Sequence, residues 1–263
     1  MSDSKLKVIV MTQADRFFIP KNIDNAARVC EILEIVEVNC KSALENRLSD
    51  YLKWFGPWQC AKMGAVTVGR EAEKYLDRLS GYRLFHGSCS VIDAAKKNHI
   101  PHRVITNSND PAFVQHVREL APDLIISYSA PQIIKPELLS VPKYGVINVH
   151  GALLPDYRGC LPSFWYLYND EKLGGATVHY MSAQIDDGDI IEQGSVDISD
   201  CNSMFKLMKM TKRVGGELML KALEDIANGT VEARKNETEK GSYFTWPTVA
   251  QAKEFRKKGK RLI

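Results

Sequence analysis

The sequence lacks the features that mark membrane, secreted and metal-binding proteins. No apolar run approaches the roughly 18 residues that a membrane-spanning helix needs. Residues 1–7 are polar and lead directly into a short apolar run, so no signal peptide is expected. The six cysteines are scattered without a Cys-x-x-Cys pair, which argues against a disulfide framework and against a zinc site. These absences predict a cytoplasmic protein without a metal.

A strong charge of either sign is also missing. The formal net charge of +3 over 263 residues is too weak to argue for nucleic acid as a partner. Only the end of the chain is distinctly basic, through Lys253, Arg256, Lys257, Lys258, Lys260 and Arg261. A solvated terminal surface is the simpler interpretation of this cluster, and contact with an anionic substrate is the alternative. Charged residues at 25% and hydrophobic residues at 44% are ordinary for a globular domain.

Strand-like and helix-like patterns alternate along the chain. Residues 7–12 form a compact β-branched run typical of a buried strand, residues 23–33 have helical spacing, and residues 34–40 alternate as a strand does. This strand–helix–strand opening predicts an α/β fold with a doubly wound, mostly parallel sheet. Residues 41–85 interrupt the pattern as a helix-rich insertion, broken at Gly56-Pro57.

The alternation resumes after the insertion. Helices are expected over residues 90–97, 110–120, 136–139 and 204–227, and strands over residues 102–106, 123–128, 145–150, 176–180 and 189–196. The segment that follows the last helix is too short to bury a core of its own. Residues 1–230 are therefore predicted to form the main domain and residues 231–263 a short C-terminal annex.

Two groups of polar residues stand where α/β folds place their sites. Asn148 and His150 fall on one face at the carboxyl end of the strand predicted over residues 145–150. A capping pair at a strand–loop junction is the simpler interpretation of this tripeptide alone. The sequence of residues 186–189, Asp-Asp-Gly-Asp, is equally compatible with a hairpin turn. Calcium is a weaker alternative, because the ligand spacing of an EF-hand is absent.

Three longer segments together resemble the folate-dependent formyltransferase family. Residues 145–159 (GVINVHGALLPDYRG) are similar to the family's Asn-x-His, Leu-Leu-Pro and Arg-Gly motifs. Residues 175–191 (GATVHYMSAQIDDGDII) are similar to its Thr-x-His strand and Asp-x-Gly-x-Ile motif. Residues 129–139 (SAPQIIKPELL) resemble the segment that lines the folate pocket. The match extends over residues 123–198 in the family's order, which makes it more specific than any single motif.

The resemblance has direct implications for fold and activity. It implies a formyltransferase-like variant of the Rossmann fold, with 10-formyltetrahydrofolate as formyl donor and no metal. Within the family, the pattern resembles sugar-nucleotide N-formyltransferases and the catalytic domain of methionyl-tRNA formyltransferase. The enzyme would move a formyl group to the amine of a small substrate.

The resemblance identifies Asn148, His150 and Asp186 as catalytic residues. An uncharged amide suits hydrogen bonding to an oxygen that gains negative charge, and an imidazole can donate to it while titrating near neutrality. Asp186 would orient that imidazole and help move the proton. Asp186 is chosen over Asp187 because the family's aspartate lies two positions before its glycine, here Gly188.

The same resemblance assigns the binding surfaces. The folate would contact Gln132, Ile133, Ile134, Leu138, Val146, Ala183, Gln184 and Ile185. The apolar members of this set are also compatible with a plain core role. Residues 241–248 (GSYFTWPT) are similar to a segment of sugar-nucleotide formylating members, which makes Tyr243 and Trp246, together with Arg158 of the Arg-Gly motif, the expected acceptor-binding residues. For the aromatic residues, packing of the C-terminal segment on the core is an equal alternative to stacking on the acceptor. His179 is interpreted as a strand residue that shapes the pocket.

A nucleotide-linked amino sugar is the expected acceptor, and three alternatives are kept. A methionyl-tRNA formyltransferase would need an RNA-binding domain after residue 228, where only about 35 residues follow. A formyltetrahydrofolate deformylase would carry a regulatory domain in front of the α/β sheet. A non-catalytic folate-binding protein is disfavoured by the presence of all three polar residues. The oligomeric state is left open, with a homodimer among the options.

Overall fold

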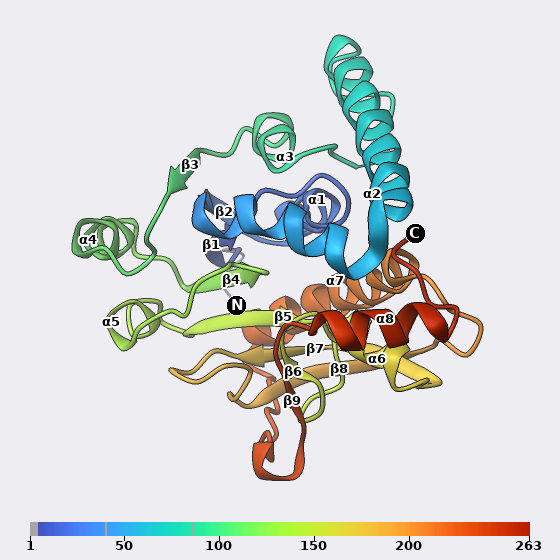
Figure 1. The fold of residues 1–263 in the computed structure, drawn as a ribbon. Helices are drawn as coiled ribbons and strands as arrows, with labels where there is room; N and C mark the ends of the chain where they lie inside the picture. Colours follow the sequence, from blue (N-terminus) through green and yellow to red (C-terminus); the bar gives the residue numbers. More distant parts are fainter. Residues whose placement is uncertain (1–4, 40, 86) are drawn as a thin grey trace.

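A seven-stranded sheet forms the centre of the molecule in a computed structural model, which describes residues 5–39, 41–85 and 87–263 (Figure 1). The strand order is β3-β2-β1-β4-β5-β7-β8. The bounds of these strands are β1 Lys7–Thr12, β2 Glu31–Val38, β3 His102–Ile105, β4 Leu124–Tyr128, β5 Val146–His150, β7 Leu173–Tyr180 and β8 Ile190–Asp197. The pairs from β3 to β5 are parallel, whereas β7 is antiparallel to both β5 and β8. The predicted doubly wound, mostly parallel sheet is confirmed.

Helices cover both faces of the sheet, and the alternation of side chains along the strands explains how. Val8 and Val10 of β1 belong to a core with the helices α1 (Ile19–Val29), α3 (Val91–Lys97) and α7 (Met204–Asn228). Ile9 and Met11 point to the other face, toward α4 (Pro111–Leu120) and α5 (Pro136–Leu139). Because both faces are buried, the strand is a continuous apolar run rather than an alternating one.

A third, aromatic core lies outside the sheet layers. It joins α2 (Lys41–Leu79), α6 (Pro162–Tyr168) and α8 (Val249–Lys257). The ring of Phe164 stacks on that of Phe255, with centroids 4.5 Å apart, and Phe55 meets the Phe255 ring edge-on at 5.9 Å. The annex therefore shares a core with the helical insertion. The annex also forms β9 (Tyr243–Phe244), which pairs with β6 (Arg158–Gly159) in a separate two-stranded sheet.

Helix boundaries follow local chemistry that the sequence displays. The side chains of Ser90, Asp110 and Ser203 each accept a hydrogen bond from a backbone N–H in the first turn of α3, α4 and α7. Gly229, with φ of 69°, ends α7 in the left-handed conformation. Gly56, with φ of 79°, divides α2 into two helical stretches at the predicted break. The helical character predicted for residues 41–85 is thus confirmed over α2.

Two predicted boundaries near the start of the chain were wrong. The predicted helix over residues 23–33 lies instead at Ile19–Val29, and the next strand begins at Glu31 rather than at residue 34. Ile32 and Leu33 satisfied the helical spacing, but Ile32 is buried within β2. Short apolar runs fit either period, and here pairing with β1 decides between them. Cys40, at the end of the predicted strand, is outside the described residues. No helix in the described part of the chain is long and apolar enough to cross a membrane.

Candidate active site

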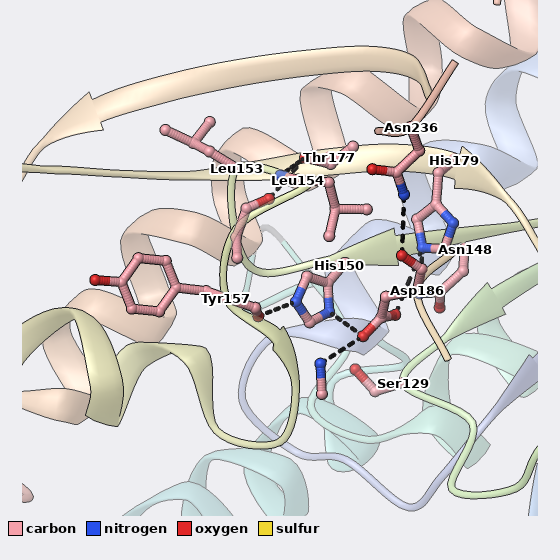
Figure 2. Close-up of polar contacts among 12 residues, drawn as sticks. Ser129, Asn148, His150, Leu153, Leu154, Tyr157, Thr177, His179, Asp186 and Asn236 are labelled. Carbon is pink, nitrogen blue, oxygen red and sulfur yellow. Dashed lines mark hydrogen bonds and ion pairs between the residues drawn. The ribbon is translucent and has the colours of Figure 1, made fainter. Parts of the chain in front are cut away.

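Strand pairing brings the predicted polar residues together at the carboxyl end of β5, an interior strand of the sheet. In the antiparallel pair of β5 and β7, Asn148 lies opposite His179 and His150 lies opposite Thr177. On its other side β5 pairs with β4, where Ser127 is opposite Asn148. Asp186 belongs to the connection between β7 and β8 and reaches back to the same place (Figure 2). Of these residues, Asn148 and His150 of β5, His179 of β7 and Asp186 of the loop converge.

Asp186 is the centre of this cluster. Its Oδ2 lies 3.4 Å from His150 Nδ1, and its Oδ1 lies 3.7 Å from His179 Nε2. The backbone N–H of Gly159 donates a hydrogen bond of 2.8 Å to Oδ2. Asp187 is turned elsewhere, where its Oδ1 accepts a hydrogen bond from Thr238 Oγ1. The structure thus brings Asp186, and not Asp187, beside the two imidazoles.

The hydrogen bonds of the two histidines define where their protons sit. His150 Nε2 is 2.8 Å from the carbonyl oxygen of Tyr157, and because a carbonyl only accepts, this nitrogen carries a hydrogen. His179 Nδ1 likewise donates to the carbonyl oxygen of Tyr180 at 2.7 Å. His179 Nε2 then accepts from Asn148 Nδ2 at 3.2 Å. A proton on His150 Nδ1 lets that ring donate to Asp186 as well.

His179 is a neutral anchor for Asn148. It is 2% exposed, and this burial lowers the pKa of His179 because the charged ring would lose its hydration. In the neutral ring with its hydrogen on Nδ1, Nε2 can act only as a hydrogen-bond acceptor. It must therefore face the NH2 group of Asn148 rather than the amide oxygen, and this sets the orientation of the Asn148 side chain. His179 therefore has a more specific position than the pocket-shaping role expected from the sequence.

The loop after β5 is tied to β7 by Thr177. The Thr177 hydroxyl donates to the carbonyl oxygen of Ala152 at 2.6 Å and accepts from the N–H of Leu154 at 3.1 Å. Thr177 and His179 lie two residues apart on one face of β7, so one holds the loop and the other holds Asn148. The Thr-x-His pattern noted in the sequence thus corresponds to two supports of the site.

The Asp186 loop is fixed from the annex. Asp186 adopts a left-handed conformation with φ of 50°, and its carbonyl oxygen accepts a hydrogen bond of 2.9 Å from Asn236 Nδ2. A Cβ on Gly188 would lie 2.0 Å from the carbonyl oxygen of Tyr180, so only glycine allows this loop to approach β7. No local sequence pattern indicates Asn236, because its partner lies 50 residues away.

The residues expected to bind folate divide into two groups. Ile134, Leu138 and Val146 are at most 2% exposed and belong to the core beneath α4 and α5, which is the alternative that the sequence left open. Ile133 and Ile185 instead are 55% and 41% exposed. The remaining members belong to the same two segments as these isoleucines. Gln132 precedes Ile133, and its Oε1 accepts hydrogen bonds from Ser108. Ala183 and Gln184 precede Ile185 in the β7–β8 connection.

The residues expected to bind the acceptor lie around the small β6–β9 sheet. Arg158 pairs with Tyr243 in register, and its guanidinium carbon lies 5.9 Å from the centre of the Tyr243 ring. Tyr243 is 48% exposed. Trp246 stacks on Trp54 of α2 with ring centroids 5.9 Å apart, so the structure places it in packing between annex and insertion.

The chemistry available at this site is acid–base and hydrogen-bonding chemistry. A hydrogen-bond donor amide, an imidazole and a carboxylate converge within direct reach of one another (Figure 2). Among the described residues no group of three or more His, Cys, Asp or Glu side chains has the arrangement of a metal site. Such a set fits a reaction in which charge develops on an oxygen while a proton moves between two heteroatoms.

Comparison with known proteins shows which family this chain matches. A family model described as "Formyl transferase" matches residues 85–223, which is just over half of the chain. Methionyl-tRNA formyltransferase of Acetivibrio thermocellus is 35% identical over 153 residues, covering 58% of this chain and 49% of the relative. The corresponding protein of Clostridium beijerinckii is 36% identical over 152 residues, covering 57% and 49%. The chain thus spans about half the length of these relatives.

Solved structures share the fold at lower identity. Glycinamide ribonucleotide transformylase 1 from Symbiobacterium toebii superposes with a TM-score of 0.63 at 13% identity, covering 90% of this chain and 96% of that one. A sugar N-formyltransferase from a Shewanella species gives a TM-score of 0.58 at 19% identity, covering 91% and 76%. At such identities the similarity concerns the fold alone.

Proposed function

Because the chain belongs to the formyl transferase family, we propose that it transfers a formyl group from 10-formyltetrahydrofolate to an amine. The observation that carries this proposal is the convergence of Asn148, His150 and Asp186 at the carboxyl end of β5. These are the three residues that the sequence motifs identified for this reaction. In the transfer, the amine nitrogen bonds to the formyl carbon, the folate nitrogen leaves, and a proton passes from the amine to that nitrogen.

Each of the three residues has a distinct part in this proposal. The Asn148 amide has two N–H groups, and since His179 accepts one of them, the other can donate to the formyl oxygen as negative charge develops there. His150 donates its Nε2–H to the Tyr157 carbonyl oxygen, so it exchanges the proton through Nδ1, the nitrogen that faces Asp186. Asp186 is a positioning residue, because its carboxylate lies against His150 Nδ1 and stabilises the protonated ring.

Two exposed apolar side chains support a folate site beside these residues. Ile133 follows β4, the strand in which Ser127 pairs with Asn148, and Ile185 directly precedes Asp186, so both segments lead away from the site. A flat fused ring placed between these segments would cover both side chains and meet backbone polar groups of residues 183–184. Ile134, Leu138 and Val146 would support that surface from below as core residues.

Folate binding should depend on Ile185. In calorimetry with a stable folate analogue, the wild-type protein is expected to bind one ligand per chain, and Ile185→Asp should weaken binding by about 10-fold or more because a charge replaces a covered apolar side chain. Ile92→Asp is the matched control, since Ile92 of α3 is 40% exposed and Ile185 is 41% exposed. Equal affinities for the two variants would remove Ile185 from the binding surface, and no binding by the wild type would remove folate.

For the acceptor, we propose an amine on a nucleotide-linked sugar. Gly159 donates its N–H to Asp186, so the neighbouring Arg158 and the exposed Tyr243 lie directly beside the catalytic cluster. Within the described residues, Arg158 Nε is buried without a hydrogen-bond partner, which leaves a donor for an anionic group such as a diphosphate. The Tyr243 ring offers a surface on which a sugar or base can stack.

An acceptor panel decides between this proposal and the alternatives. The protein is incubated with 10-formyltetrahydrofolate and, separately, with amino-sugar nucleotides, glycinamide ribonucleotide and methionyl-tRNA, and the mass gain of a formyl group is measured. Formylation of an amino-sugar nucleotide is expected, with an activity that falls about 10-fold or more in Arg158→Gln. Formylation of methionyl-tRNA alone would replace the sugar with tRNA. Release of formate without any acceptor would instead indicate a deformylase.

A further inference from the structure

The second stretch of α2 has an apolar stripe on its outer side. Its large members are Trp58, Val68, Tyr75 and Leu79, which are between 65% and 70% exposed. Three exposed alanines complete it, Ala61, Ala65 and Ala72. Together the seven residues recur at alternating steps of three and four, which is the spacing of the apolar seam of a coiled coil. Figure 1 shows that this part of α2 stands out from the rest of the molecule.

The inner side of the same stretch is fixed to the body by polar contacts. Arg70 donates to the carbonyl oxygens of Arg16, at 2.7 Å, and of Ser88, at 3.2 Å. Further along, Arg78 forms an ion pair of 2.7 Å with Asp93 of α3. These contacts set the rotation of the helix about its axis. The helix therefore cannot turn the stripe inward without breaking them.

Two glycines that border the stripe have no explanation among the residues that the structure describes. Gly64 and Gly69 lie inside the helix, neither has a positive φ, and a Cβ on either would meet no atom of the described residues within 4 Å. Glycine at such a position costs about 1 kcal/mol relative to alanine, so the fold of one chain favours alanine there. A second helix backbone that approaches closely is a physical reason for glycine at both positions.

We propose that a second copy of this chain packs on the stripe, with the two helices antiparallel about a two-fold axis. With such an axis each copy uses the same surface, so no free stripe remains for a third copy and the assembly is a dimer. One antiparallel register places stripe residues of the two copies opposite each other. In this register Trp58 faces Tyr75 of the other copy. Ala61 then faces Ala72, and Ala65 faces Val68. Three charged residues flank the stripe, and each lies opposite an uncharged residue of the other copy, so no like charges come together. Their opposite partners are Gly69 for Lys62, Gly64 for Glu71 and Pro57 for Arg78.

The size of the stripe sets the strength of this dimer. From residue 58 to residue 79 the helix is about 33 Å long and about 10 Å wide. Pairing two such faces covers on the order of 1,000 Å² in total, which is the lower limit for a specific interface. The expected dimer is therefore a weak one with a dissociation constant in the micromolar range, and its population depends on protein concentration.

Sedimentation velocity of the whole chain between about 1 and 100 µM tests the proposal. The wild-type protein should shift from the monomer toward twice the monomer mass, whereas Val68→Asp should remain a monomer throughout. Val66→Asp is the matched control, because Val66 is an exposed valine of the same helix outside the stripe. Thermal unfolding confirms that both variants are folded. A monomeric wild type, or loss of the dimer in both variants, would overturn the proposal.

Cysteine pairing tests the orientation of the two helices. In a Cys60→Ser background, Ala61→Cys and Ala72→Cys variants are oxidised separately and as a mixture. An antiparallel pair forms the cross-link mainly in the mixture, and efficient cross-linking of each variant alone would contradict the proposed orientation.

Binding to vesicles that contain anionic phosphatidylglycerol tests whether the stripe contacts a lipid surface rather than a second copy. A monomer that binds these vesicles through Val68 would assign the stripe to a lipid surface instead.

Discussion

Asp186→Asn is expected to lower kcat by about 100-fold or more, while Asp187→Asn stays within about twofold of the wild type. The first change removes the negative charge that lies 3.4 Å from His150 Nδ1, so the protonated ring loses its stabilising partner. The second leaves an oxygen that can still accept from Thr238 Oγ1. Formyl transfer is measured at saturating donor and acceptor.

The adjacent aspartates make this comparison unusually direct. Both substitutions remove one charge from the same loop, so any general effect of the loop on stability should be similar. A normal kcat for Asp186→Asn would remove this residue from the catalytic group, and a selective loss in Asp187→Asn would transfer its role to the neighbouring carboxylate. Thermal unfolding of each variant separates loss of turnover from loss of the fold.

Asn148→Asp should have the largest effect on turnover, a loss on the order of 1,000-fold in kcat. The substitution has nearly the same shape but removes the amide donor and places a negative charge where the formyl oxygen also becomes negative. Asn202→Asp, an exposed residue just before α7, is the control for the added charge. Near-normal turnover of Asn148→Asp would show that another group stabilises the oxygen.

The same variant has a second readout at His179. In the wild-type protein, burial lowers the pKa of His179, so its ring should remain neutral throughout the neutral pH range. A carboxylate at position 148 favours the charged ring of His179 and should therefore raise its pKa. In an NMR titration, the His179 signals should then shift at a higher pH than in the wild type. An unchanged titration would mean that the contact between residues 148 and 179 is absent in solution.

The sheet was predictable because its strands are continuous apolar runs bounded by polar residues, and its helices have capping residues at their ends. The strand at Leu124–Tyr128 and the helix at Pro111–Leu120 agree with their predicted bounds to within one residue. The helices α6 and α8 were not predicted. They depend on aromatic packing such as that of Phe164 on Phe255, which joins residues far apart in the sequence and has no periodic signature.

The catalytic candidates and the Thr-x-His pair of β7 were identified from sequence motifs, whereas the residues that support the Asp186 loop were not. Asn148 and His150 lie two residues apart on one strand, so period-two alternation places them on one face. Asp186 needed the resemblance to a family, because its position depends on the β7–β8 connection. The contacts from Gly159 and Asn236 to the Asp186 residue follow only from tertiary structure.

The link between Asn236 and the carbonyl oxygen of Asp186 has a consequence for redesign. The annex carries Tyr243 beside Arg158, and the same annex holds the loop from which Asp186 projects. Grafting an annex from a relative to change the acceptor would therefore also alter the placement of a carboxylate that serves turnover. Chimaeras built at residue 230 should inherit both properties together, unless the donor segment supplies an amide at the position of Asn236.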